Sequence, residues 1–228
     1  MRAGILLPVP PADELRRRVP VVLAGLVLFG IGIGLMVRAE LGLAPWDVLH
    51  QGISDRTGLP MGTVTILTGV TVLLGWIPLR QRLGLGTVLN ALVIGVVVDA
   101  TLALVDAPET MPVRIALLVV GVFLFGPGSG LYIGAGLGPG PRDGLMTGLS
   151  RGGRSVRVVR TGIELSVLAV GVLLGGSAGV GTILFAATVG PNVHLFLEVM
   201  GMPPPRSRGE CEGGSRPPLP RRIRLRRS

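Results

Sequence analysis

One thirty-residue segment occurs twice in this chain. Residues 25–54 align without a gap with residues 121–150, and fifteen of the thirty positions are identical. After a shift of one residue the match resumes, with residues 84–95 recurring as residues 179–190. The second half is therefore a copy of the first, about ninety-five residues further along the chain. Such an internal repeat predicts a fold built from two related halves.

The composition is that of a membrane protein. The mean hydropathy is +0.65, and only 15% of the residues are charged, which is too apolar for an ordinary soluble domain. Most of the hydrophobic stretches approach the ~20 residues needed to cross the hydrocarbon core. We therefore expect an all-α polytopic membrane protein with about six transmembrane helices, over residues 19–37, 61–79, 85–105, 113–133, 161–174 and 181–200.

Each copy of the repeat contains three of these stretches. Because an odd number of crossings turns the second copy upside down, we predict two inverted three-helix repeats related by a pseudo-two-fold axis in the membrane plane. The repeats are expected at residues 19–110 and 111–202, after a cytoplasmic N-terminal segment at residues 1–18. Residues 203–228 are rich in Pro, Arg, Gly and Ser. We expect them to form a disordered basic cytoplasmic tail.

The positive charge is distributed unevenly along the chain. All 22 basic residues are arginine, and the formal net charge is +9. With a cytoplasmic N-terminus and six crossings, three arginines (Arg38, Arg56 and Arg114) lie outside, and the other nineteen lie inside. This split follows the positive-inside rule. It predicts that both termini are cytoplasmic, and it accounts for the charge without a nucleic-acid partner.

Glycine and proline interrupt the chain between the first and second stretch of each copy. The two segments read Leu-Gly-Leu-Ala-Pro-Trp-Asp-Val-Leu from Leu41 and Leu-Gly-Pro-Gly-Pro-Arg-Asp-Gly-Leu from Leu137. Proline is favoured at the first position of a helix, and the helix dipole favours a carboxylate in the first turn. We expect Pro45 and Pro141 each to begin a short half-helix, which either re-enters the membrane or lies on its surface.

The candidate binding site lies between these two segments. Two carboxylates related by the duplication, beside irregular backbone, could bind a cation, a proton or a polar solute. Alternatively, each caps only its own short helix. A further acid interrupts the third apolar stretch, where it costs roughly 2.5–3.5 kcal/mol at mid-bilayer; it is either a coupling group or snorkels to water. The expected substrate-binding residues are Pro45, Trp46, Asp47, Asp99, Pro141, Arg142 and Asp143.

Other polar residues in the apolar stretches have simpler explanations. Glu164 lies four residues after Arg160, a spacing that favours an ion pair along a helix. Asn90 and His194 are single polar groups on apolar helices, which are more often packing residues than ligands. Arginines recur every third residue from Arg151 to Arg160. This stripe anchors the helix end at lipid headgroups or, alternatively, binds an anionic solute.

The sequence carries no catalytic or metal-binding motif. It contains no GxSxG, HExxH, Walker A or CxxC sequence. The single cysteine, Cys211, lies in the C-terminal tail. We therefore expect no enzymatic activity, no cofactor and no metal site.

The repeated pattern Leu-Gly-x-x-Pro-x-Asp-x-Leu-x-x-Gly-x-Ser, after a glycine-rich helix, resembles a known family. Over about residues 20–200 the chain is similar to the YczE branch of the YczE/YyaS/YitT group of bacterial integral membrane proteins. The first copy has the family's Pro-Trp-Asp signature, whereas the second has Pro-Arg-Asp. The resemblance implies a multi-pass protein of the bacterial plasma membrane and assigns no activity.

Together these features favour a permease for a small solute or ion, or the relic of one. Its expected partners are the lipid bilayer, a small polar solute or cation, and a second copy in a homodimer. The alternative is a non-transporting accessory or regulatory protein, which partners another membrane protein or an enzyme. Architecture alone does not decide between them.

Overall fold

The computed structural model describes residues 7, 10–150 and 155–199, and this part of the chain folds into eight α-helices without a β-strand. The C-terminal tail, Cys211, Arg151 and Arg154 lie outside the described residues. The helices are α1 (Ala12–Ala39), α2 (Pro45–Thr57), α3 (Met61–Leu79), α4 (Leu85–Leu104), α5 (Met111–Gly134), α6 (Pro141–Leu149), α7 (Val156–Leu173) and α8 (Val180–Val199).

The long helices coincide with the predicted hydrophobic stretches. In the described part of the chain, α1, α3, α4, α5 and α8 are long and apolar enough to cross a membrane. The remaining long helix, α7, has 18 residues and includes Arg157, Arg160 and Glu164. The all-α, multi-pass fold class is thus confirmed, while the sixth crossing remains a prediction.

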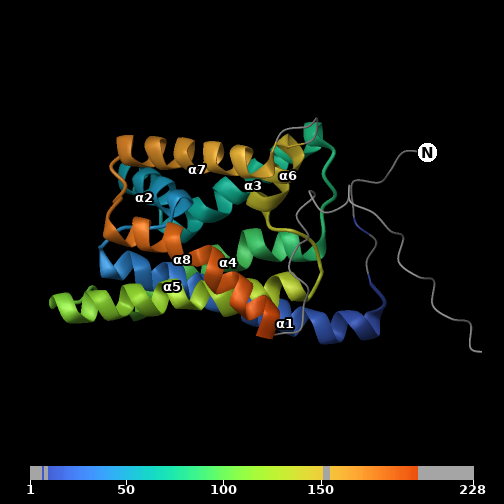
Figure 1. Ribbon diagram of the computed structural model, residues 1–228, viewed down its shortest axis with the longest axis horizontal. Coiled ribbons are helices and arrows are strands. Elements are labelled where there is room, and N and C mark those ends of the chain that lie inside the picture. Colours follow the sequence, from blue (N-terminus) through green and yellow to red (C-terminus); the bar gives the residue numbers. More distant parts are fainter. Residues whose placement is uncertain (1–6, 8–9, 151–154, 200–228) are drawn as a thin grey trace, which may run out of the picture.

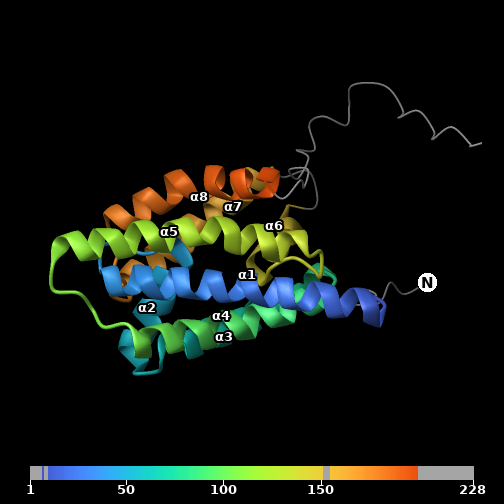
Figure 2. The ribbon, with the colours of Figure 1, turned by 90° about the horizontal axis from the view of Figure 1, so that it is seen from below.

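Four long helices form one layer, in the order α8, α5, α1, α4 (Figure 2). The two central helices, α1 and α5, come from corresponding parts of the two copies and run in opposite directions (Figure 2). Glycine lets them approach closely: a Cβ on Gly32 would lie 2.8 Å from the carbonyl oxygen of Gly121, and the reverse distance is also 2.8 Å. Small residues at such crossings allow backbone contact between membrane helices.

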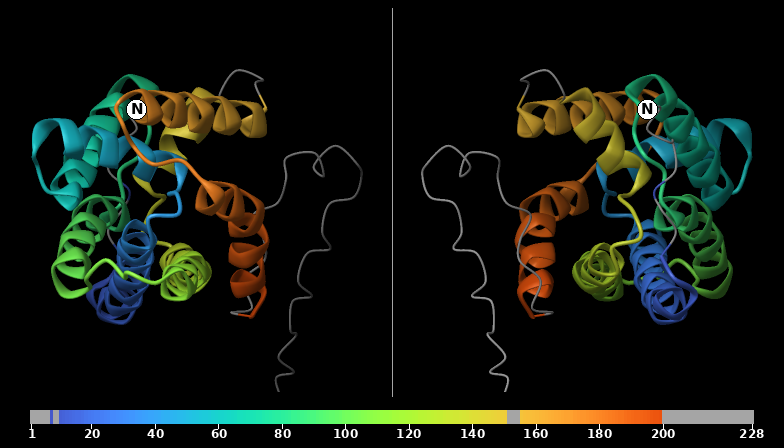
Figure 3. Two further views of the ribbon diagram at one scale, coloured as in Figure 1. Left: turned by 90° about the vertical axis from the view of Figure 1, so that its left-hand side faces the viewer. Right: turned by 90° about the vertical axis from the view of Figure 1, so that its right-hand side faces the viewer.

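The other four helices, α2, α3, α6 and α7, lie on one face of this layer (Figure 3). Viewed along the long axis of the molecule, α1, α4 and α5 are seen nearly end-on, while α7 crosses above them (Figure 3). The short helices α2 and α6 lie toward opposite ends of the long axis (Figure 1). Helix α2 packs on α7, and α6 packs on α3, so each short helix contacts a long helix of the other copy.

Both short helices begin where the sequence predicts. Pro45 and Pro141 are their first residues, and the preceding residues have nearly the same conformation: φ −62°, ψ 151° for Ala44 and φ −62°, ψ 156° for Gly140. Earlier in each break, Gly42 and Gly138 have φ of +112° and +122°. Residues other than glycine rarely adopt such angles. The duplicated glycine and proline therefore define the break and the new helix start in both copies.

Each broken segment is tied to the other copy by a backbone hydrogen bond. The N–H of Gly181, at the start of α8, donates to the carbonyl of Leu41 at 2.7 Å. The N–H of Gly86, at the start of α4, donates to the carbonyl of Leu137 at 2.8 Å. Because the two bonds involve corresponding residues, the two halves interlock in a reciprocal manner.

Candidate functional site

A cavity of about 350 Å³ lies between the two layers of helices. All eight helices contribute to its wall. Of the predicted site residues, Pro45 and Trp46 from the first segment line it together with Pro141, Arg142 and Asp143 from the second. The volume is within the range of pockets that hold small organic molecules.

The residues that follow the two prolines meet in this wall. The guanidinium carbon of Arg142 lies 5.0 Å from the centroid of the Trp46 ring. This is a cation–π contact. Trp46 and Arg142 occupy the same position in the two copies, so the duplicated segments touch each other directly. The indole N–H of Trp46 is buried and has no hydrogen-bond partner in the described structure.

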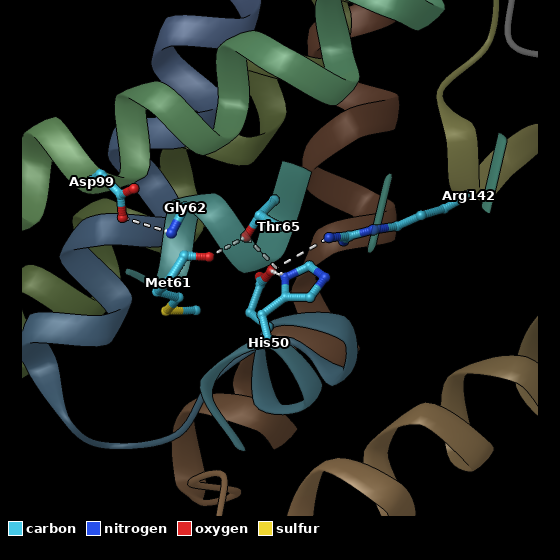
Figure 4. Close-up of polar contacts among 7 residues, drawn as sticks. His50, Met61, Gly62, Thr65, Asp99 and Arg142 are labelled. Carbon is cyan, nitrogen blue, oxygen red and sulfur yellow. Dashed lines mark hydrogen bonds and ion pairs between the residues drawn. The ribbon is translucent and has the colours of Figure 1, made fainter. Parts of the chain in front are cut away.

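Asp47 is buried behind the cavity wall, in a polar network with three residues that line the cavity, His50, Thr65 and Arg142. Figure 4 shows these three side chains close together. Oδ1 of Asp47 lies 3.5 Å from Nη2 of Arg142 and 3.4 Å from Nδ1 of His50. The hydroxyl of Thr65 lies 3.2 Å from the same His50 nitrogen. Asp47 and His50 are each 1% exposed. A carboxylate this deeply buried needs a cationic partner, and Arg142 supplies it across the cavity wall.

Asp143 is placed differently from its counterpart. Its side chain is exposed and lines the cavity. It makes no ion pair within the described residues. A Cβ built on Gly140 would lie 3.2 Å from Oδ2 of Asp143 and 3.8 Å from both Nδ2 of Asn90 and the hydroxyl of Tyr132. Three polar groups thus converge over the start of α6.

Arg160 and Glu164 also line the cavity, from α7. Nε of Arg160 lies 2.8 Å from Oε1 of Glu164, so the ion pair predicted from their spacing is confirmed. The spacing gave no indication that this pair faces a cavity. Helix α7 packs mainly on α2 and has few close contacts with α8, and the side chains of the pair are 55% and 34% exposed.

Asp99 lies away from the cavity, at the start of α3 (Figure 4). Its two carboxylate oxygens accept hydrogen bonds from the backbone N–H groups of Gly62 at 2.6 Å and Thr63 at 3.2 Å. The first N–H groups of a helix have no partner within the helix. Asp99 therefore caps α3 from a neighbouring helix, an arrangement that the sequence expectation of a coupling or snorkelling acid did not include.

Aromatic side chains gather around the cavity. The ring centroids of Phe29 and Phe125 are 4.5 Å apart, and those of Phe125 and Phe185 are 4.7 Å apart. With Trp46 and Tyr132 they make five of the chain's eight aromatic residues. Of these five, the sequence analysis selected only Trp46, although Phe29 and Phe125 occupy the same position in the two copies.

Further polar residues line the cavity without having been expected there. Asn90 and His194 are wall residues, and Nδ1 of His194 lies 3.2 Å from Oε1 of Glu198. His50 also lines the cavity, from the position occupied by Met146 in the other copy. No group of three or more His, Cys, Asp or Glu residues suited to a metal ion occurs among the described residues.

The chain is similar to several bacterial proteins over most of its length. The profile of the Family of unknown function (DUF6198) matches residues 16–198. An uncharacterized protein of Haemophilus influenzae is 41% identical over 189 residues, covering 82% of this chain and 87% of that protein. Two Bacillus subtilis proteins also match: the uncharacterized membrane protein YczE at 36% identity (81% and 87% covered) and the uncharacterized protein YyaS at 26% (77% and 90% covered). No solved structure matches significantly. The expected resemblance to YczE and YyaS is confirmed.

Proposed function

From the premise that the chain belongs to the Family of unknown function (DUF6198), we propose that it is a permease for a small solute or ion. In this proposal the solute binds in the cavity between the two broken segments. The observation that carries the proposal is that corresponding residues of both copies, Pro45 and Pro141 with their successors, line one shared cavity. Transporter sites form at repeat interfaces of this type, where discontinuous helices supply polar groups.

The relation between the two halves supports an alternating-access mechanism. Helices α1 and α5 run in opposite directions. Each copy donates one backbone hydrogen bond to the other, and the two bonds involve corresponding residues. Two inverted three-helix repeats would have these properties. In such a protein the second conformation is reached when the two halves exchange their packing.

A difference in packing between the halves indicates where the solute enters. Helix α3 packs along α4, whereas α7 has few close contacts with α8. A Cβ on Gly95 would lie 2.5 Å from Cγ1 of Ile66 in α3, but a Cβ on the corresponding Gly190 would have no neighbour within 4 Å. In the proposed mechanism the cavity is open between α7 and α8 and closed between α3 and α4, and transport reverses this arrangement.

The proposal is tested by reconstitution. The purified full chain is placed in liposomes, and uptake is measured for a panel of small organic solutes and inorganic ions of both charges. We expect flux of at least one class that depends on the protein and is lost with Asp143→Asn. The matched control is Asp55→Asn, which removes an exposed acid that does not line the cavity.

The accessory-protein alternative makes the opposite prediction. If no member of the panel is transported, and a membrane protein or enzyme co-purifies at fixed stoichiometry, the permease proposal is refuted. Replacing Asp143 should not affect such a complex, because the Asp143 side chain lines the cavity. Enzymatic activity is not part of either proposal.

A further inference from the structure

We infer that the solute of this cavity is a small organic cation, such as an amine or a quaternary ammonium compound. The inference rests on the proposed function, because it assigns a substrate class to the same cavity. It is carried by the carboxylate of Asp143, which makes no ion pair with any described residue and lies in a cavity wall rich in aromatic rings.

The duplication explains why Asp143 is unpaired. Its counterpart, Asp47, is bound by Arg142 and by His50. In the other copy the position of Arg142 is occupied by Trp46, and the position of His50 by Met146. Neither tryptophan nor methionine can neutralise a carboxylate. The groups that lock the first acid into the wall are therefore missing around the second.

The two arginines of the wall do not fill this role. The surrounding protein desolvates the Asp143 carboxyl and raises its pKa, and Arg160 and Arg142 offset this only in part. Arg142 lies against Asp47, and Arg160 is paired with Glu164. Among the described residues, the charged side chains of the wall, together with Asp47 behind them, leave one negative charge without a partner. The positive end of α6 offsets about half a charge, so the cavity still favours a cation.

The rest of the wall suits an organic cation better than a metal ion. Phe29, Phe125, Phe185 and Tyr132 line the cavity in addition to Trp46. Aromatic rings attract organic cations through their π faces, by about 0.5–2 kcal/mol each. Ca²⁺ and Mg²⁺ instead need a cage of several oxygen ligands, and the described residues contain no such cluster.

The groups over Gly140 provide the site for the charged end of the solute. Asp143, Asn90 and Tyr132 converge on the space where a Cβ of residue 140 would lie. The carboxylate would pair with the ammonium group. The phenol oxygen of Tyr132, whose own O–H donates to the carbonyl of Gly138, can accept a hydrogen bond from an N–H of the solute, whereas Nδ2 of Asn90 is a donor. The apolar body of the solute would lie toward the phenylalanine rings.

The test compares three ligands of different charge. Benzyltrimethylammonium is the cation, phenylacetate is the anion, and rubidium chloride tests a metal ion alone. Binding to the purified full chain in detergent is measured by isothermal titration calorimetry. We expect benzyltrimethylammonium to bind, and Asp143→Asn to weaken its binding at least ~10-fold, the effect of losing one charged contact of about 1.4 kcal/mol. Asp55→Asn should leave the dissociation constant unchanged.

A second variant guards against misfolding of the first. Gly140→Ala places a methyl group in the polar corner, 3.2 Å from Oδ2 of Asp143. The backbone tolerates alanine there, because Ala44 has nearly the same φ and ψ at the corresponding position. We expect this variant to fold and to bind benzyltrimethylammonium at least ~10-fold more weakly, because the added methyl group blocks the contact between the ammonium group and the Asp143 carboxylate.

The outcomes separate this inference from the proposed permease. Binding of phenylacetate or rubidium but not of benzyltrimethylammonium, or cation binding that survives both variants, overturns the organic-cation inference. If phenylacetate is then taken up by proteoliposomes, the permease proposal stands without it. Conversely, if benzyltrimethylammonium binds as expected but neither it nor any member of the solute panel is transported, the cavity is a binding site for organic cations and the permease proposal is refuted.

Discussion

Replacing Asp99 decides whether this intramembrane acid has a structural or a transport role. The carboxylate accepts two backbone N–H groups, from Gly62 and Thr63, at the start of α3. The residue before the helix, Pro60, contributes no side-chain cap. Asp99→Ala therefore leaves both donors without their acceptor, and we expect the variant to be less stable.

The size of the effect follows from these contacts. A hydrogen bond to a charged group contributes roughly 1.5–3 kcal/mol when nothing replaces it. Water or headgroups can reach the freed N–H groups in part, because Asp99 is only half-buried. We therefore expect a loss of about 2 kcal/mol, the upper end for helix caps. For a chain of this size that corresponds to a fall in melting temperature of ~4–8 °C.

Two measurements are needed. Thermal unfolding of the purified protein in detergent is monitored by intrinsic fluorescence, and solute flux is measured separately in liposomes. Asp99→Asn retains one acceptor oxygen, so it should show about half the loss of stability. Asp55→Asn serves as the control for charge. If Asp99→Ala melts at the wild-type temperature while flux is abolished, Asp99 is a coupling group and the capping argument is refuted.

Two further predictions concern the buried ion pair and the orientation of the chain. Arg142→Leu removes the guanidinium partner of the buried Asp47 carboxylate and leaves it only the contact with His50, which should cost ~3 kcal/mol of stability. Adding Asp47→Asn should restore most of this loss, and a double variant no more stable than Arg142→Leu would contradict the pairing. In a Cys211→Ser background, Asp55→Cys at the end of α2 should react with a membrane-impermeant thiol reagent on intact cells, and Leu149→Cys at the end of α6 only after lysis. Labelling of both from one side would refute the inverted repeats.

Local sequence was sufficient for the features that depend on neighbouring residues. Pro45 and Pro141 begin half-helices because proline fits the first turn of a helix in any surroundings. Arg160 and Glu164 pair because four residues bring them to one helix face. The five candidate spans found in the described residues follow from long, mainly apolar stretches.

Contacts between residues far apart in the sequence could not be predicted in this way. Asp47 and Asp143 sit in the same local motif, yet one is locked behind the wall and the other lines the cavity. The difference comes largely from a partner ninety-five residues away, since Nη2 of Arg142 lies 3.5 Å from Oδ1 of Asp47. Asp99 caps a helix whose first residues lie 37 positions earlier. No periodicity within a single helix specifies these distances.

The sequence by itself determined that the protein is a duplicated, helical membrane protein with two broken segments, because apolar length, glycine and proline act locally. Only the tertiary structure decided which acid is paired, which caps a helix and which faces a cavity. The physical reason is that burial and charge pairing depend on what the fold brings within a few ångströms. Trp46 and Arg142 show this directly: the difference between these equivalent positions gives Asp47 a cationic partner, and gives Asp143 none among the described residues, only when the two copies meet.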